Sequence, residues 1–242
     1  QHRRCLTGFP LPPELVGRLE ADLDESVRLE MRKQSSGEAP VATLRVYVLG
    51  RFRVTIGDYE IPDSVWRNQR ARFLLGYLAC RGHQPLSEDI LVEELWPEEA
   101  RGRHNLYSLR SFLRKSMRLP EQSEASEANA IDYIQKSSSG LQINPEVPLW
   151  CDATEFERIL DEIPSAERQG RPMVAISLYR EAIALWQGSF MDNCYLNWAE
   201  SFRQRLLRRL TEALTRYGQL AFQHDLAEEV LSASEKLRAR RT

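Results

Sequence analysis

Residues 101–118 read RGRHNLYSLRSFLRKSMR, the most informative stretch of the chain. It holds six arginine or lysine residues and no acidic residue, although the whole chain has a formal net charge of −2. On a helix with about 100° per residue, its apolar side chains fall on one side. We therefore predict an amphipathic helix that buries one face and exposes a polar, basic one. The apolar face is formed by Leu106, Leu109, Leu113 and Met117.

The polar face of this predicted helix suits the major groove of DNA. Short polar side chains reach base edges there, and arginine and lysine bind guanine edges or phosphates. The charge run alone leaves open an alternative, a solvated basic helix with no partner. We predict DNA contacts at Arg103, His104, Tyr107, Ser108, Ser111, Arg114, Lys115 and Arg118.

The segments around this helix follow the order of a winged helix. Strand-like alternation is broken by a Gly57-Asp58 turn signal, two helical patterns follow, and the basic helix comes third. A predicted hairpin comes after the basic helix. The predicted segments are strands at 44–49, 52–56 and 59–61, helices at 69–81, 87–96 and 101–118, and hairpin strands at 131–135 and 141–143.

In a winged helix the third helix reads the groove, and the hairpin touches the DNA backbone or the minor groove. We therefore also predict DNA contacts at Lys136, Ser137 and Ser138, in and beside the hairpin turn. This order of elements makes DNA binding the favoured function of the basic helix.

From Asp152 onward the pattern is helical throughout. Asp152 and Glu155 have the spacing of a capping box, with Asp152 as the cap. Pairs of helices of this length resemble tetratricopeptide-type units. Expected helices start at 152 and cover 173–186, 195–217 and 219–238.

Two clusters in this helical part have two interpretations each. Four aromatic residues near one helix junction are predicted to be core, with a partner groove as the alternative. Four arginines on the next helix are predicted to form a solvated face, with a second DNA contact as the alternative. The aromatic residues are Trp186, Phe190, Tyr195 and Trp198, and the arginines are Arg203, Arg205, Arg208 and Arg209.

No sequence motif points to catalysis. The chain has no phosphate-binding glycine loop, no zinc-binding HExxH and no nucleophile elbow, so neither an enzyme nor a bound cofactor or metal is expected. Its four cysteines are scattered, which favours a reducing, cytoplasmic setting, and Cys80 and Cys194 are predicted to be buried. No run is long and apolar enough to cross a membrane, so no membrane partner is expected.

The chain resembles the Streptomyces antibiotic regulatory protein (SARP) type of activator, an OmpR/PhoB-like winged helix followed by a bacterial transcriptional activator domain. The resemblance implies a mainly α fold with small antiparallel β-sheets, in which a winged helix-turn-helix precedes a tetratricopeptide-like all-α domain. It runs from about 44 to 238 and rests on matching stretches at 44–52, 67–78, 91–97, 105–106, 113–115, 140–141, 151–156, 178–190 and 198–200, and on Ser111.

The resemblance implies a winged-helix DNA-binding domain over 43–147 and a bacterial transcriptional activator domain over 148–242. It also implies an activator that binds direct repeats in double-stranded DNA, contacts RNA polymerase and forms a homodimer. Residues 1–42, with a predicted helix at 13–34, are expected to be a remnant of, or a link to, an upstream region.

Two other interpretations remain open. In the first, the winged helix docks a protein instead of DNA, and the chain is an interaction module. In the second, the chain is the output fragment of a larger signalling protein with an upstream sensor or nucleotide-binding domain.

Overall fold

The computed structural model describes residues 41–97, 102–118, 131–224 and 226. Residues Gln1–Val41 and Ala42–Thr242 form two separate units, and the second is described here. The predicted helix at 13–34 lies outside the described residues, as do the acidic stretch 121–129 and the end of the predicted helix 219–238.

A small sheet opens the described part of the chain. Strands β1 (Leu44–Tyr47), β2 (Arg53–Ile56) and β3 (Tyr59–Glu60) are antiparallel, as predicted. Gly57 supplies the positive φ of 56° that the turn between β2 and β3 requires. Alternate side chains of β1 and β2 are fully buried, so the sheet has one core face.

A fourth strand was not predicted. β6 (Leu149–Cys151) pairs in parallel with β1, opposite Leu44–Val46, and gives the strand order β3-β2-β1-β6. Its three residues are too few to produce a periodic pattern. The predicted domain boundary at 147/148 therefore falls just before a strand of the first sheet, and that division remains a prediction.

Three helices follow the sheet. A single 3₁₀ turn, η1 (Val65–Arg67), precedes α3 (Gln69–Cys80), and α4 (Glu88–Leu95) and α5 (Gly102–Ser116) come next. Asn68 caps α3, and the Ser87 side chain caps α4 by accepting the N–H of Ile90, so the predicted N-cap at Ser87 is confirmed. Caps of this kind set where each helix begins, while apolar stripes set how the three pack.

The predicted hairpin follows α5. It consists of β4 (Ile134–Ser137) and β5 (Gly140–Ile143). Leu86, before α4, adds to this hairpin through two backbone hydrogen bonds with Leu141, of 2.9 and 2.8 Å. Three helices followed by a hairpin that pairs with the segment between the first two is the predicted winged-helix order.

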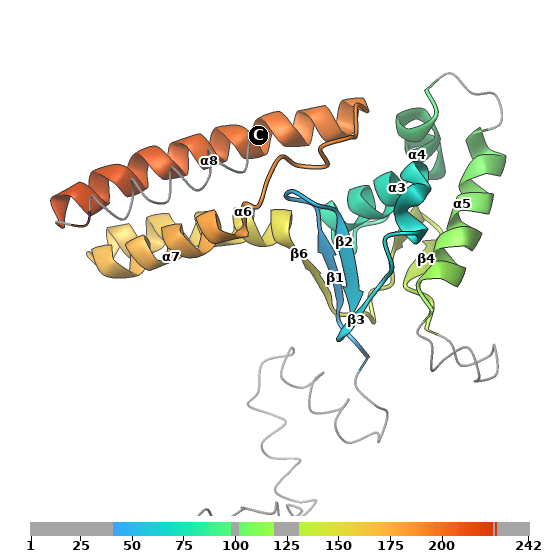
Figure 1. Cartoon of the computed structure of the whole chain (residues 1–242), viewed down its shortest axis with the longest axis horizontal. Helices are drawn as coiled ribbons and strands as arrows, with labels where there is room; N and C mark the ends of the chain where they lie inside the picture. Colours follow the sequence, from blue (N-terminus) through green and yellow to red (C-terminus); the bar gives the residue numbers. More distant parts are fainter. Residues whose placement is uncertain (1–40, 98–101, 119–130, 225, 227–242) are drawn as a thin grey trace, which may run out of the picture. The chain divides into compact units, whose positions relative to one another are not determined.

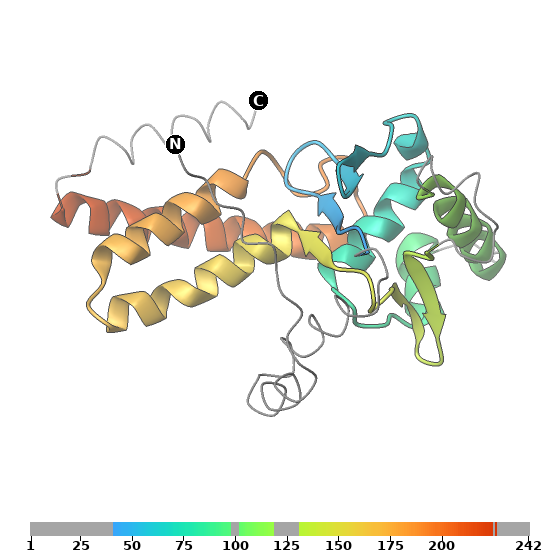
Figure 2. The same ribbon diagram turned by 90° about the horizontal axis from the view of Figure 1, so that it is seen from below.

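The rest of the chain is helical, as predicted. α6 (Asp152–Arg168), α7 (Pro172–Leu185) and α8 (Asn197–Gln223) lie side by side in Figures 1 and 2. The predicted break between 217 and 219 is wrong, because α8 continues through Gly218. Tyr217, Leu220 and Ala221 are buried on either side of that glycine, and this packing outweighs its low helix propensity.

The predicted capping role of Asp152 is also wrong. Cys151 occupies the N-cap of α6 without a side-chain cap, and Asp152 is the first helical residue. The Asp152 carboxylate instead accepts the backbone N–H groups of Val48, at 2.9 and 3.1 Å, and Leu49, at 3.0 Å. Burial raises the pKa of Asp152 to about 6, against the lowering effect of these hydrogen bonds. A buried carboxylate thus joins the start of α6 to the end of β1.

The connection between α7 and α8 meets the same end of β1. Met191 donates its N–H to the carbonyl of Val48 at 2.9 Å, and Gly50 donates to Ser189 at 3.1 Å. Trp198, in the first turn of α8, stacks on Tyr77 of α3 with ring centroids 4.5 Å apart. Sheet, α3 and α8 therefore share one core.

The predicted aromatic core is confirmed for three of its four residues. Trp186, Phe190 and Trp198 are buried, whereas Tyr195 is 86% exposed. The prediction is wrong for Tyr195, which lies in the α7–α8 connection. Cys194 is buried as predicted, but Cys80 is only half-buried.

The predicted solvated face on α8 needs correction as well. Arg203 donates to the carbonyls of Phe190, Met191 and Cys194. Arg205 pairs with Glu157 of α6 at 3.0 Å, and Arg209 binds Asp161 and Glu157. These three arginines hold α8 to its neighbours instead of lying free in solvent. Arg208, whose side chain is 72% exposed, lies on a solvated face as predicted.

We predict that Asp152 makes stability depend on pH. Because the folded-state pKa of about 6 lies above that of an unfolded aspartate, the folded state binds the proton more tightly. The free energy of unfolding should therefore fall as pH rises from about 4 to about 6, by about 3 kcal/mol, and level off above. Urea unfolding at several pH values, compared with Asp152→Asn, measures this.

Asp152→Asn has no titratable group at this position, so its free energy of unfolding should not fall between about pH 4 and about pH 6. The exposed Asp58→Asn is the control and should keep the wild-type pH profile. Parallel profiles for wild type and Asp152→Asn would contradict the assignment.

We also predict that Gly140 cannot be replaced. Its φ is +134°, and a Cβ added there would lie 1.9 Å from the carbonyl oxygen of Leu86. Gly140→Ala should lower the free energy of unfolding by at least about 2 kcal/mol, measured by urea denaturation.

The matched control is Gly82→Ala, at a φ of +65° with no atom within 4 Å of the added Cβ. It should cost only about 1 kcal/mol of backbone strain. Equal losses in the two variants would show that the contact with Leu86 contributes nothing.

Candidate nucleic-acid interface

α5 has the predicted two-sided character. Its buried face consists of Leu106, Leu109 and Leu113, which are at most 5% exposed, and the helix packs on its neighbours α3 and α4. Gly102 starts the helix against α4, where an added Cβ would lie 2.4 Å from Val92. The opposite face is exposed. It presents Arg103, His104, Tyr107, Ser108, Ser111, Arg114 and Lys115.

One predicted contact residue lies apart from this face. Arg118 follows the end of α5 and is half-buried. The sequence predicted a helix that continues to residue 118, and on that helix Arg118 belongs to the polar face. The observed helix ends at Ser116. The prediction of DNA contact is untested for all of these residues.

The hairpin is attached to α5 through a lysine. Lys136 of β4 donates to the Tyr107 hydroxyl at 3.2 Å and pairs with Glu88 of α4 at 2.6 Å. Its ammonium also lies 5.3 Å from the centre of the Tyr107 ring. The hydrogen bond with Glu88 raises the pKa of Lys136, which keeps it charged. One side chain thus connects α4, α5 and the hairpin.

The serines of the hairpin differ in what they do. Ser137 accepts the N–H of Ser139 and donates to the carbonyl of Gly140, so its hydroxyl shapes the turn. Ser138 is exposed at the tip. Of the two predicted contacts, Ser138 is therefore the one whose side chain is available.

Acidic side chains accompany several of the basic ones, which the sequence analysis did not foresee. Arg103 pairs with Asp89 of α4. Arg114 and Arg110 both lie 3.6 Å from the Asp132 carboxylate. Asp132 stands just before β4, and only the tertiary fold brings it to α5.

Lys115 differs from these paired residues. It is exposed, and it has no ion-pair partner within the ranges that the structure describes. Together with His104, Ser108 and Ser111 it makes the central strip of the exposed face. The basic residues of the interface therefore divide into paired ones, Arg103, Arg114 and Lys136, and the unpaired Lys115.

The interface is a surface and not a ligand cavity. The space enclosed between α5 and the hairpin is about 10 Å³, close to the volume of a single water probe. Among the described residues no three potential metal ligands cluster together. None of the described helices has the length and apolar character to span a bilayer.

Residues 151–241 match the bacterial transcriptional activator domain, in agreement with the predicted second domain. The structure is similar to that of Mycobacterium tuberculosis EmbR, solved in complex with a low-affinity phosphopeptide, with a TM-score of 0.64 and 22% identity. The similarity covers 80% of this chain but only 49% of EmbR, so this chain spans about half the length of that protein. Comparison with curated protein sequences gives no match.

The match to the bacterial transcriptional activator domain supports a role of the transcriptional-activator kind, that is, a regulator and not an enzyme. The likeness to EmbR bears on the fold, which agrees with the predicted winged helix followed by an all-α domain.

Proposed function

We propose that the protein is a sequence-specific DNA-binding transcriptional activator of the SARP type. α5 is the recognition helix, and the β4–β5 hairpin is the wing. The observation that carries this proposal is the exposed face of α5. It offers hydrogen-bond donors and positive charge with no acidic residue of its own, beside a hairpin attached through Lys136.

The central strip of α5 would read the bases. His104, Ser108 and Ser111 are short enough for the helix to approach the floor of the major groove closely. Lys115, one turn beyond Ser111, has a flexible stem that reaches a guanine edge or a phosphate.

The paired basic residues would act on the DNA backbone. On binding, Arg103, Arg114 and Lys136 would exchange their carboxylate partners for phosphates. Arginine binds both groups through the same planar fork, so the exchange needs little reorganisation. Because each carboxylate partner must first be displaced, each phosphate contact contributes less to the free energy of DNA binding. DNA that is not well positioned does not displace the carboxylates and binds more weakly.

We further propose that the α6–α8 region makes the contacts of activation. Its match to the bacterial transcriptional activator domain supports contacts with RNA polymerase and formation of a homodimer on direct repeats. The same proposal includes a winged helix of the OmpR/PhoB-like type, helix pairs of the tetratricopeptide-like type and a cytoplasmic location. It also includes an upstream sensor or nucleotide-binding domain.

The second candidate is a protein-docking winged helix. Two observations favour it. Acidic partners neutralise Arg103, Arg114 and Lys136. In addition, two large hydrophobic residues are exposed, Tyr107 at 53% and Ile90 at 45%. This candidate predicts no salt-dependent affinity for DNA.

Selection from random duplex DNA at two salt concentrations, followed by sequencing, separates the two candidates. An enriched repeated element, with affinity falling steeply as salt rises, is expected and would give the half-site spacing. Failure to retain any DNA at low salt would reject the DNA-binding proposal in favour of protein docking.

We predict that Lys115→Ala weakens DNA binding by more than about 1 kcal/mol and that Arg114→Ala does the same. If Lys115 binds a phosphate, the slope of log affinity against log salt should fall by about 0.9. Arg208→Ala on α8 is the matched control and should bind as wild type. Unchanged affinity in the Lys115 and Arg114 variants at fixed salt would refute this placement of the recognition helix.

We predict the opposite sign for Glu88→Gln. Removing this charge frees Lys136, whose ammonium lies 2.6 Å from the Glu88 carboxylate. DNA affinity, measured by fluorescence anisotropy, should rise by a few-fold, corresponding to a surface ion pair of up to about 1 kcal/mol. A loss of affinity would mean that Glu88 positions the wing instead of competing with DNA.

A further inference from the structure

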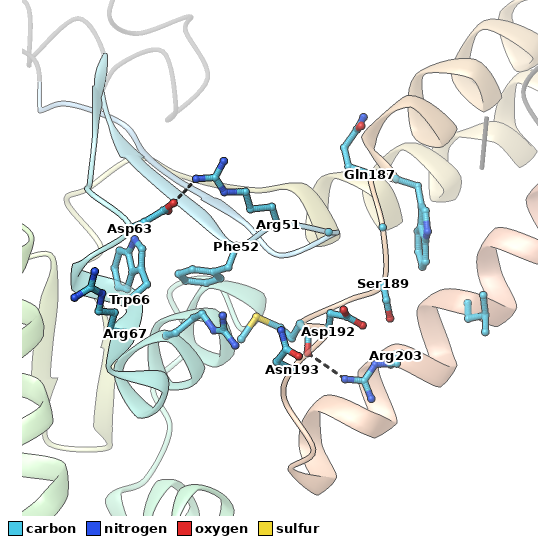
Figure 3. A pocket seen from close by; sticks show the side chains of 16 residues that line it. Arg51, Phe52, Asp63, Trp66, Arg67, Gln187, Ser189, Asp192, Asn193 and Arg203 are labelled. Atoms are coloured by element: carbon cyan, nitrogen blue, oxygen red, sulfur yellow. Dashed lines mark hydrogen bonds and ion pairs between the residues drawn. The ribbon is translucent and has the colours of Figure 1, made fainter. Parts of the chain in front are cut away.

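A cavity of about 840 Å³ lies away from the proposed DNA interface. One wall comes from the β1–β2 loop, η1 and the start of α3, and the other from the α7–α8 connection and α8 (Figure 3). No residue of α5, β4 or β5 lines it. Its volume is in the range of sites that hold small molecules.

The lining is rich in arginine. Arg51, Arg67, Arg72 and Arg203 face two carboxylates, those of Asp63 and Asp192. Arg51 is paired with Asp63 and Arg203 with Glu200, so the positive charge available in the cavity is that of Arg67 and Arg72, opposed by Asp192. An excess of positive charge in a concave site attracts anions.

Two of these arginines are held in place. Arg203 extends from α8 and donates to three backbone carbonyls, at 2.8–3.2 Å. Arg51 is paired with Asp63, as the dashed line in Figure 3 marks.

The other two are not neutralised. Within the ranges that the structure describes, neither Arg67 nor Arg72 has an ion-pair partner, and Arg72 only lies over the Phe73 ring, 5.4 Å from its centre. Arg67 is exposed and Arg72 is half-buried. Arg67 is the last residue of η1, and Arg72 lies in the first turn of α3.

The cavity wall also contains a donor without an acceptor. The indole Nε1 of Trp66 is buried and has no hydrogen-bond partner among the described residues. This atom is closed to solvent, so it belongs to the packing behind the wall and is not a contact offered to a ligand.

We propose that this cavity binds a small molecule carrying a phosphoryl group. The planar guanidinium groups of Arg67 and Arg72 match the oxygens of a phosphate through paired hydrogen bonds. The volume of about 840 Å³ leaves room for the remainder of a metabolite beside the phosphoryl group.

Binding would act on the junction between the sheet and the helices α6–α8. Because residues of both walls contact one ligand, the ligand stabilises their present arrangement by mass action. This site is separate from the proposed DNA interface. Its test therefore begins with a titration that contains no DNA, and a second titration adds duplex DNA as a competitor.

The test is a titration of the full chain with inorganic pyrophosphate, followed by tryptophan fluorescence, since Trp66 and Trp186 line the cavity. Saturable binding and a raised Tm are expected. Arg67→Gln and Arg72→Gln should each weaken binding about tenfold, as loss of a charge-assisted hydrogen bond does. Arg168→Gln, at the exposed end of α6, is the control and should bind as wild type.

Asp192→Asn gives an effect of opposite sign. It removes an exposed carboxylate from the lining and should tighten pyrophosphate binding by a few-fold. A variant that merely disturbed the fold would not bind more tightly.

Three results would overturn the proposal. The first is the absence of saturable binding into the millimolar range. The second is equal binding by wild type and the Arg67→Gln, Arg72→Gln double variant. The third is displacement of bound pyrophosphate when duplex DNA is added, which would mean that Arg67 and Arg72 bind the DNA backbone.

Discussion

The Asp152 carboxylate, almost fully buried, accepts backbone N–H groups from Val48 and Leu49, and the arrangement of the chain depends on this contact. It binds the N–H groups of the two residues that follow β1, beside the bridge between Leu49 and Phe190. It also stands at the first turn of α6, so the direction in which the helical region leaves the sheet is set there. Burial opposes the charge, as the raised pKa near 6 shows, and the backbone hydrogen bonds offset part of that cost.

The proposed DNA interface depends on a different interaction, the pairing of its basic side chains with carboxylates of neighbouring elements. α5 contains no acidic residue, yet Asp89 and Asp132 pair with its arginines from neighbouring elements. The Arg103–Asp89 pair is exposed and therefore weak in water, whereas Arg110 and Arg114 share the half-buried Asp132 carboxylate. Such pairs leave the basic side chains extended and exchangeable, whereas the buried leucines of α5 make the helix itself a rigid platform.

The junction between the sheet and the helices α6–α8 combines buried contacts with charged side chains. Stacking of Tyr77 on Trp198 and the backbone bonds of Met191 and Gly50 make it firm. Beside this core lies the arginine-lined cavity, where the ligand proposed above would contact both the sheet side and the helical side of the junction.

Short-range patterns in the sequence were sufficient for the helices, the antiparallel strands, the hairpin and the two-sided α5, because side-chain periodicity and turn residues act over a few positions. The sequence did not reveal the role of Asp152, which acts across 104 positions, or the parallel pairing of β6. Nor did it reveal the carboxylates that accompany Arg103, Arg114 and Lys136. Each of these depends on which segments come together in space, and hydrogen bonds and ion pairs between distant segments leave no periodic trace along the chain.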